Sequence, residues 1–182
     1  MKRWIIFVSV AAAVWFLWHA SGGGVATTLP EGGFMYPGYQ IAPLEDYTIE
    51  ARVLSRHEYR HDREAALAPT DLALGWGPMA DDAVLAEIDV SQNNRWYYWR
   101  AAHLPIPASE IAHHSANVHV IAASAAAAQA LTRVAAHDRV RLAGKLVEVR
   151  GDDGWHWRSS LSRTDTGAGS CEVLWLEHVE VL

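Results

Sequence analysis

The segment DRVRLAGKLVEV alternates apolar and polar side chains, but the alternation changes phase in its middle. Val140 and Leu142 occupy even-numbered positions. After Gly144, the apolar residues Val147 and Val149 occupy odd-numbered positions. Because successive side chains of a strand point to opposite faces, one face stays buried along the whole segment only if a residue is inserted near the glycine. The segment therefore predicts one long strand with a β-bulge, which bends the strand around a small core.

Strand-like alternation recurs on both sides of one clear helix. The other segments predicted as strands are DYTIEARVLS, RWYYWRA, NVHVIAA, WHWRSSL and CEVLWLEHVEVL, although the first also permits a helix. Just before the bent strand, Ser124 is a good helix N-cap, and Leu131 and Val134 share one face of the helix that it would start. A shorter helix is predicted after Asp81 or Asp82.

Strands, one helix and further strands, with a bent strand after the helix, form a layout that resembles the OB-fold. That fold is a small five-stranded barrel with a helix between its third and fourth strands. The resemblance covers about residues 47–182 and rests on the order of the elements, not on a residue motif. We therefore predict a mainly β domain with one helix (α+β), shaped as an OB-fold-like small barrel.

The N-terminus opens with Lys2 and Arg3, which are followed by an apolar run that ends at Ala20. A helix needs about 20 apolar residues to cross a bilayer, and this run is at the short end of that range. We therefore predict an uncleaved transmembrane anchor over residues 1–20. A cleaved secretion signal is the alternative, but cutting after Ala20 would leave the bulky Trp18 where a small residue is required.

Basic residues precede the apolar run, and none follows it until Arg52. This asymmetry favours a single-pass protein with its N-terminus in the cytoplasm and its domain outside, in the periplasm if the membrane is a bacterial inner membrane. Residues 21–43 are rich in Gly and Pro, which predicts a tether. The exported β-barrel-like domain is then expected over residues 44–182.

The chain is acidic, with a formal net charge of −6. An acidic surface disfavours nucleic acid, which binds basic faces. The expected partners are the membrane, through the N-terminal helix, and either another envelope protein or a small neutral ligand. Cys171 is the only cysteine, so no intramolecular disulfide can form, and its place in an alternating strand predicts a buried structural thiol.

The segment His57-Glu58-Tyr59-Arg60-His61 matches the H-E-x-x-H pattern of zinc hydrolases. In a helix the two histidines would share a face and hold one zinc ion, while Glu58 would act as the general base. On a strand the histidines would lie roughly 13 Å apart, too far for one ion. Arginines crowd the motif and no third ligand has a recognisable spacing, so we interpret the segment as a charged strand end or surface turn.

His119 is a further candidate metal ligand or general base. In the predicted strand NVHVIAA, His119 and Asn117 face opposite to Val118 and Val120. A polar face of this kind usually points to solvent, so we expect these two side chains to be exposed.

Tryptophan is frequent in the exported part of the chain. Four tryptophans are candidates for a platform that stacks a ring-shaped ligand, a sugar or a peptide: Trp96, Trp99, Trp155 and Trp157. The competing interpretation, which we favour, is that these rings fill the core of a small barrel.

These observations favour a membrane-anchored envelope protein that acts as a non-enzymatic binding or assembly module. No cofactor is expected. The alternative is an anchored zinc-dependent hydrolase that uses His57, Glu58 and His61.

Overall fold

The computed structural model describes residues 32–167 and 169–182. The predicted anchor over residues 1–20 and the first part of the predicted tether lie outside these residues. Of the helices that the structure describes, none has both the length and the apolar character needed to cross a membrane. The described chain is mainly β with a few short helices, as the sequence predicts.

Strands make up most of the described chain. They are β1 (Phe34–Tyr36), β2 (Tyr39–Glu58), β3 (Thr70–Gly75), β4 (Asp89–Asn93), β5 (Trp96–Arg100), β6 (Ser115–Ala122), β7 (Arg139–Gly151), β8 (His156–Arg158) and β9 (Glu172–Val181). The helices are α2 (Asp82–Leu85), α3 (Ala108–His113) and α4 (Ala125–Leu131), with 3₁₀ turns at Glu64–Ala66 and Gly77–Ala80. The clear helix expected after Ser124 is therefore α4, between β6 and β7.

Five of these strands are hydrogen-bonded in a closed ring. β2 pairs with β3 on one side and with β7 on the other, and the order continues from β3 through β6 and β9 back to β7. Within the ring β6 and β9 run parallel, whereas the other pairs are antiparallel. β1 and β8 extend the sheet beyond the ring.

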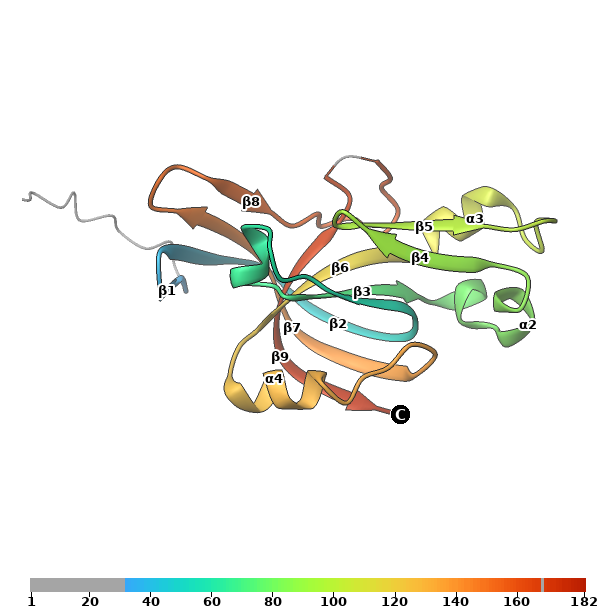
Figure 1. Cartoon of the computed structure of the whole chain (residues 1–182), viewed down its shortest axis with the longest axis horizontal. Coiled ribbons are helices and arrows are strands. Elements are labelled where there is room, and N and C mark those ends of the chain that lie inside the picture. The colour runs from blue at the N-terminus through green and yellow to red at the C-terminus, as the bar shows by residue number, and fades with distance from the viewer. Residues whose placement is uncertain (1–31, 168) are drawn as a thin grey trace, which may run out of the picture.

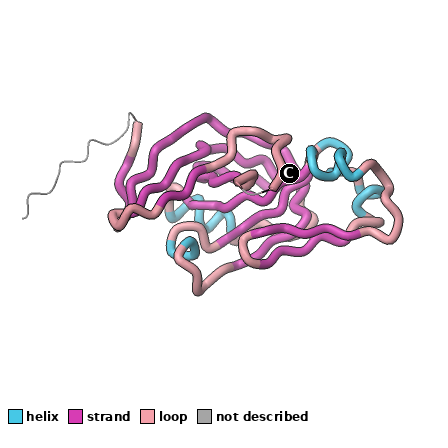
Figure 2. The backbone as a smooth tube through the Cα atoms, turned by 90° about the horizontal axis from the view of Figure 1, so that it is seen from above, coloured by secondary structure: helices cyan, strands magenta, loops and turns pink. Residues whose placement is uncertain are grey.

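β4 and β5 form a separate two-stranded hairpin. The hairpin lies at the top of the view in Figure 1, and α4 lies at the bottom, beside β9. Figure 2 shows the strands from above, with α2 and α3 at one end of the molecule. Since α2 precedes β4 and α3 follows β5, this is the open end of the hairpin.

A bulge lies opposite Gly144, but it is in β9 and not in β7 as predicted. Ala143 pairs with His178 and Gly144 with Leu176, so the extra residue is Glu177 of β9. The apolar phase of β7 changes because Val147 and Val149 pack in a second cluster, while Leu146 stays in the ring core with Val140 and Leu142. A Cβ atom on Gly144 would lie 2.0 Å from the backbone oxygen of Trp175, so the close approach of the two strands requires glycine here. β2 carries two further register shifts, one between Pro43 and Glu45 and one between Val53 and Ser55. Such shifts bend long strands.

The interior of the ring is a hydrophobic core. Its buried members include Tyr47, Ile49, Val53, Leu72, Leu74, Val118, Val120, Val140, Leu142, Leu174 and Leu176. Leu131 of α4 joins the same core, and the predicted cap is formed, because the Ser124 hydroxyl accepts a hydrogen bond from the backbone N–H of Ala127. Asp81 caps α2 in the same way.

Three segments differ from the sequence prediction. DVSQN, which is not among the segments predicted as strands, forms the hairpin strand β4. TDLALG, which is not among them either, forms the ring strand β3. All its residues are buried, so it lacks the polar face that creates a visible alternation. β2 begins at Tyr39, inside the predicted tether of residues 21–43, and Ile41 is fully buried. The described domain therefore starts before residue 44.

Candidate functional site

The β4–β5 hairpin ends in a tight turn. Its two central residues, Asn94 and Arg95, have positive φ angles of 51° and 66°. Two-residue hairpin turns with this left-handed backbone match the twist of the strands that they join. The turn directs the side chain of Arg95 toward the closed ring of strands and away from solvent.

Arg95 fastens the hairpin to the ring. Its guanidinium donates hydrogen bonds to Oδ1 of Asp71 on β3 at 2.8 Å and to Oδ1 of Asp62 at 2.6 Å. The same group lies 3.9 Å from the centre of the Tyr59 ring. The hydrogen bond from Arg95 lowers the pKa of Asp62, so this carboxylate is held in its charged form beside the guanidinium.

The polar face of β6 lies beneath this hairpin. Asn117 is 1% exposed and His119 is 3% exposed, so the prediction that these side chains face solvent is wrong. The Asn117 amide donates to Asp71 at 3.2 Å and its oxygen accepts from Gln92 of β4 at 2.7 Å. The alternation in the sequence shows that β6 has a polar face, but it does not show that the β4–β5 hairpin lies over that face.

His119 belongs to the same buried network. Its Nδ1 lies 2.9 Å from Oδ1 of Asp71, an ion-pair distance at which the two atoms are not aligned for a hydrogen bond. The imidazole also packs against the ring of Trp157, with 4.9 Å between the ring centres. His119 is therefore enclosed, and these contacts fix its position beside Asp71.

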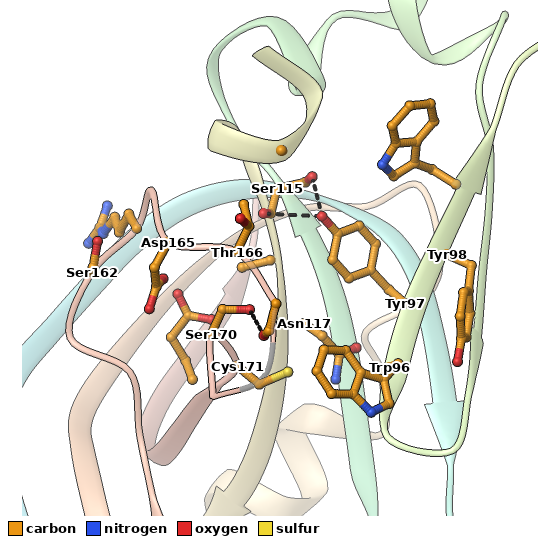
Figure 3. Close-up of a pocket in the computed structure, with 16 residues that line it drawn as sticks. Trp96, Tyr97, Tyr98, Ser115, Asn117, Ser162, Asp165, Thr166, Ser170 and Cys171 are labelled. Carbon is orange, nitrogen blue, oxygen red and sulfur yellow. Dashed lines mark hydrogen bonds between the residues drawn. The ribbon is translucent and has the colours of Figure 1, made fainter. Parts of the chain in front are cut away.

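A pocket of about 360 Å³ opens beside the hairpin, between β5, the first residues of β6 and the loop residues 162–167 and 170–171. Figure 3 shows Trp96 and Tyr97 on the hairpin side and Asp165 and Thr166 on the loop side. Tyr97 is fixed by a 2.9 Å hydrogen bond between its hydroxyl and that of Ser115. Trp96 is 38% exposed, so its ring is available to a ligand.

Glu172 is among the residues that line the pocket and is only 2% exposed. Its Oε2 atom has no hydrogen-bond partner among the described residues. Burial raises the pKa of this carboxyl to about 8, because the charged form loses its hydration. The pocket lining thus includes a carboxyl group that is predominantly protonated at neutral pH.

Cys171 also lines the pocket and is partly exposed, whereas the sequence predicts a buried thiol. Partial burial nevertheless raises the pKa of the thiol to about 12. The thiol is therefore neutral at physiological pH. Because the reactive form of cysteine is the thiolate, Cys171 contributes an unreactive, uncharged group to the pocket lining.

The four candidate tryptophans lie in two places. Trp96 and Trp99 of β5 line the pocket. Trp155 and Trp157 pack together with 5.8 Å between their ring centres, and they join a separate cluster around Val149. The structure therefore brings only the first pair to the pocket.

The HEYRH segment is not helical. His57 and Glu58 are the last residues of β2, and the chain leaves the strand at Tyr59. The Glu58 carboxylate accepts hydrogen bonds from Arg56 at 2.5 Å and Thr70 at 2.8 Å, and the His57 ring packs on that of Tyr59. In residues 32–167 and 169–182, no three His, Cys, Asp or Glu side chains are grouped so that they could hold a metal ion.

Sequence reasoning identified Trp96 and Trp99 but missed Glu172. The available signal was its position, because Leu174 and Leu176 are apolar at the same alternating positions of β9 and face the ring core. An acidic residue in phase with core residues indicates a buried carboxyl. Arg95 and Asp71 carried no comparable signal, since their contact depends on how the hairpin folds over β3.

The pocket combines flat aromatic surfaces, an unpaired buried carboxyl and a neutral thiol. This arrangement can stack a ring or an alkyl chain and can hydrogen-bond one polar group. No family model, curated protein or solved structure matches this chain. A proposal about its function therefore rests on the geometry of the site.

Proposed function

We propose that this protein is a non-enzymatic binding module of the cell envelope, and that it holds a small ligand or a protruding group of a partner protein in the pocket beside β5. One observation carries the proposal. The buried Glu172 carboxyl, with an unpaired Oε2, lines a 360 Å³ cavity that also has Trp96 in its wall. Concave sites with aromatic walls and a few polar groups are the usual places where proteins bind small molecules.

The arrangement of the ring supports a finer description, an OB-fold-like small barrel. The helix α4 follows the third ring strand in sequence order, and the third and fifth ring strands, β6 and β9, are parallel neighbours. In OB-folds, ligands are bound on a strand face and by the loops beside it. The proposed pocket uses β6 and the loop before β9 in a comparable way.

The envelope location rests on the N-terminal sequence. Lys2 and Arg3 before the apolar run favour an anchor with a cytoplasmic N-terminus and an exported domain. We expect alkaline phosphatase, which is active only outside the cytoplasm, to be active when fused after Leu182 of the full chain. The same fusion to a chain in which Lys2 and Arg3 are replaced by Glu should lose much of that activity. An inactive fusion to the unaltered chain would place the domain in the cytoplasm.

Binding at the pocket can be observed through the indole N–H signals of tryptophan. The full-length protein, labelled with ¹⁵N in detergent micelles, would be titrated separately with N-acetylglucosamine, N-acetylphenylalanine amide and n-butylammonium. At least one of these probes should shift the signals of Trp96 and Trp99, with saturation, while the signals of Trp155 and Trp157 stay in place.

A matched pair of variants tests whether the shifts report the pocket. Trp96→Leu should weaken binding of the active probe at least tenfold, whereas Leu104→Ala, which shortens an exposed apolar side chain outside the pocket, should leave it unchanged. If none of the probes shifts Trp96, or if all the tryptophan signals move together, the pocket is not a binding site for these classes of ligand.

A further inference from the structure

The carboxyl of Glu172 is an uncommon group in its position. It stands in phase with Leu174 and Leu176, which face the core of the ring, and it is 2% exposed. Burying a carboxyl without partners is unfavourable in either protonation state, and more so for the carboxylate. A buried group of this kind that lines a cavity is poised to bind a ligand that supplies the missing hydrogen bonds.

Arg163 is the cation that acts on Glu172: its charge lowers the pKa of the carboxyl, but burial raises that pKa by more. Arg163, which also lines the pocket, donates to the backbone oxygen of Thr48 at 2.9 Å and lies 5.1 Å from the centre of the Tyr47 ring. The other titratable groups that face Glu172 are neutral or acidic: Tyr47 from β2, Tyr97 from β5, and Asp165 and Cys171 from the loop.

Asp165 adds a second carboxyl to the pocket. Its Oδ2 accepts a hydrogen bond from the Ser160 hydroxyl at 2.7 Å, which fixes the side chain on the loop side. On the opposite side, the face of Trp96 can attract a positive charge through its π electrons. Asp165, Trp96 and Glu172 therefore favour positive charge, and the guanidinium of Arg163 opposes them.

We infer that this pocket binds an organic cation that carries N–H groups, an alkylammonium or a guanidinium, with Glu172 as its counter-ion and Trp96 as its stacking surface. The inference rests on the proposed function and specifies the class of ligand. Charge-assisted hydrogen bonds to a carboxylate are among the strongest that proteins make, and a dry pocket strengthens them.

Binding of such a cation is coupled to release of a proton. In the free protein, burial holds Glu172 in its protonated form near neutral pH, with a pKa of about 8. When the cation enters, the carboxyl O–H bond breaks, the proton passes to the buffer and the cation takes its place. At pH 7 nearly one proton should leave for each cation bound, and affinity should rise with pH up to about pH 8.

Isothermal titration calorimetry with n-butylammonium tests this inference on the full-length protein in micelles at pH 7. Titrations in phosphate and in Tris, whose heats of ionisation differ, give the number of protons released. We expect saturable binding with nearly one proton released. The neutral analogue 1-butanol and the cation tetramethylammonium, which has no N–H, should each bind at least tenfold more weakly.

The Glu172→Gln variant should bind n-butylammonium at least tenfold more weakly and release no proton. Glu177→Gln, on the exposed part of the same strand, is the matched control and should behave like the parent protein. Proton release by the parent protein remains a test even if Glu172→Gln does not fold. Equal affinity in Glu172→Gln, equal binding of either analogue, or binding without proton release would overturn the inference.

The result also separates this inference from the proposed function. If n-butylammonium does not bind but a neutral probe still shifts the Trp96 signal, the cation inference fails and the binding module stands; if neither binds, both fail. The peptide N-acetyl-Gly-Lys-Gly-amide, compared with its Gln analogue, distinguishes the sources of the cation. Tighter binding of the lysine peptide than of n-butylammonium indicates a side chain of a partner protein, and the reverse order indicates a free amine.

Discussion

At the scale of single residues, Glu172 combines a structural cost with a proposed role. Its carboxyl is buried against the ring core without a partner for Oε2 among the described residues. Natural proteins keep such unfavourable groups mainly where function requires them. The raised pKa makes the cost measurable, because it ties the stability of the domain to pH.

The sign of this pH dependence follows from the two pKa values of Glu172. Below pH 4.5, its ordinary value, both the folded and unfolded chains hold the proton, and above it only the folded chain does until about pH 8. The unfolded state therefore binds fewer protons in this window, and the free energy of unfolding falls as pH rises. The loss from this group should reach about 3–5 kcal/mol by pH 8.

Urea unfolding at pH 5 and pH 8 measures this loss. Glu172→Gln should be more stable than the parent protein at pH 8, and its free energy of unfolding should fall less between the two pH values. Glu177→Gln should follow the parent protein. The same pH slope in all three proteins would show that Glu172 titrates at its ordinary pKa.

At the scale of elements, the β4–β5 hairpin determines what the site contains. It covers Asn117, supplies Trp96 and Trp99 to the pocket, and is held by the contact of Arg95 with Asp71. Asp71 is fully buried, so removal of its partner leaves a buried charge without compensation. The hairpin and the pocket should therefore be lost together when this ion pair is broken.

Arg95→Ala should lower the free energy of unfolding by about 3–5 kcal/mol, because the Asp71 carboxylate loses its guanidinium. Adding Asp71→Asn should restore part of that loss by removing the buried charge. Arg100→Ala, which removes an exposed arginine paired with the exposed Asp89 of the same hairpin, should change it by no more than about 0.5 kcal/mol. Chemical denaturation provides the values, and a loss in Arg95→Ala no larger than in Arg100→Ala would contradict the fastening role of Arg95.

At the scale of the whole molecule, the sequence predicts the parts of the fold that depend on local pattern. Ser124 predicts the start of α4, since this signal lies within a few residues. The phase change at Gly144 predicts a bulge in β7, but the extra residue is in β9, because Val147 and Val149 pack in a second cluster. β3 is missed because its residues are buried on both faces. The sequence therefore predicts a bent, mainly β domain but not the order of its strands.

The candidate site is less predictable because its parts are distant in the sequence. Trp96, Asn117 and Glu172 meet only when the hairpin, β6 and the loop before β9 are assembled. The aromatic content of the chain indicates that a stacking surface is possible, but four tryptophans with similar local patterns separate into the pocket and a second cluster. Long-range packing, which no local pattern encodes, decides between these places.

The central claim is that the buried Glu172 carboxyl is the receptor group of the pocket beside β5. Carbon NMR of full-length protein labelled with [δ-¹³C]glutamate, with Glu172→Gln used to assign the signal, tests it most directly. The account predicts that the Glu172 signal titrates with a midpoint of about 8 in the free protein, and that saturating n-butylammonium moves this midpoint down by about two pH units or more. A midpoint near 4.5 in the free protein, or one that n-butylammonium does not change, would contradict it.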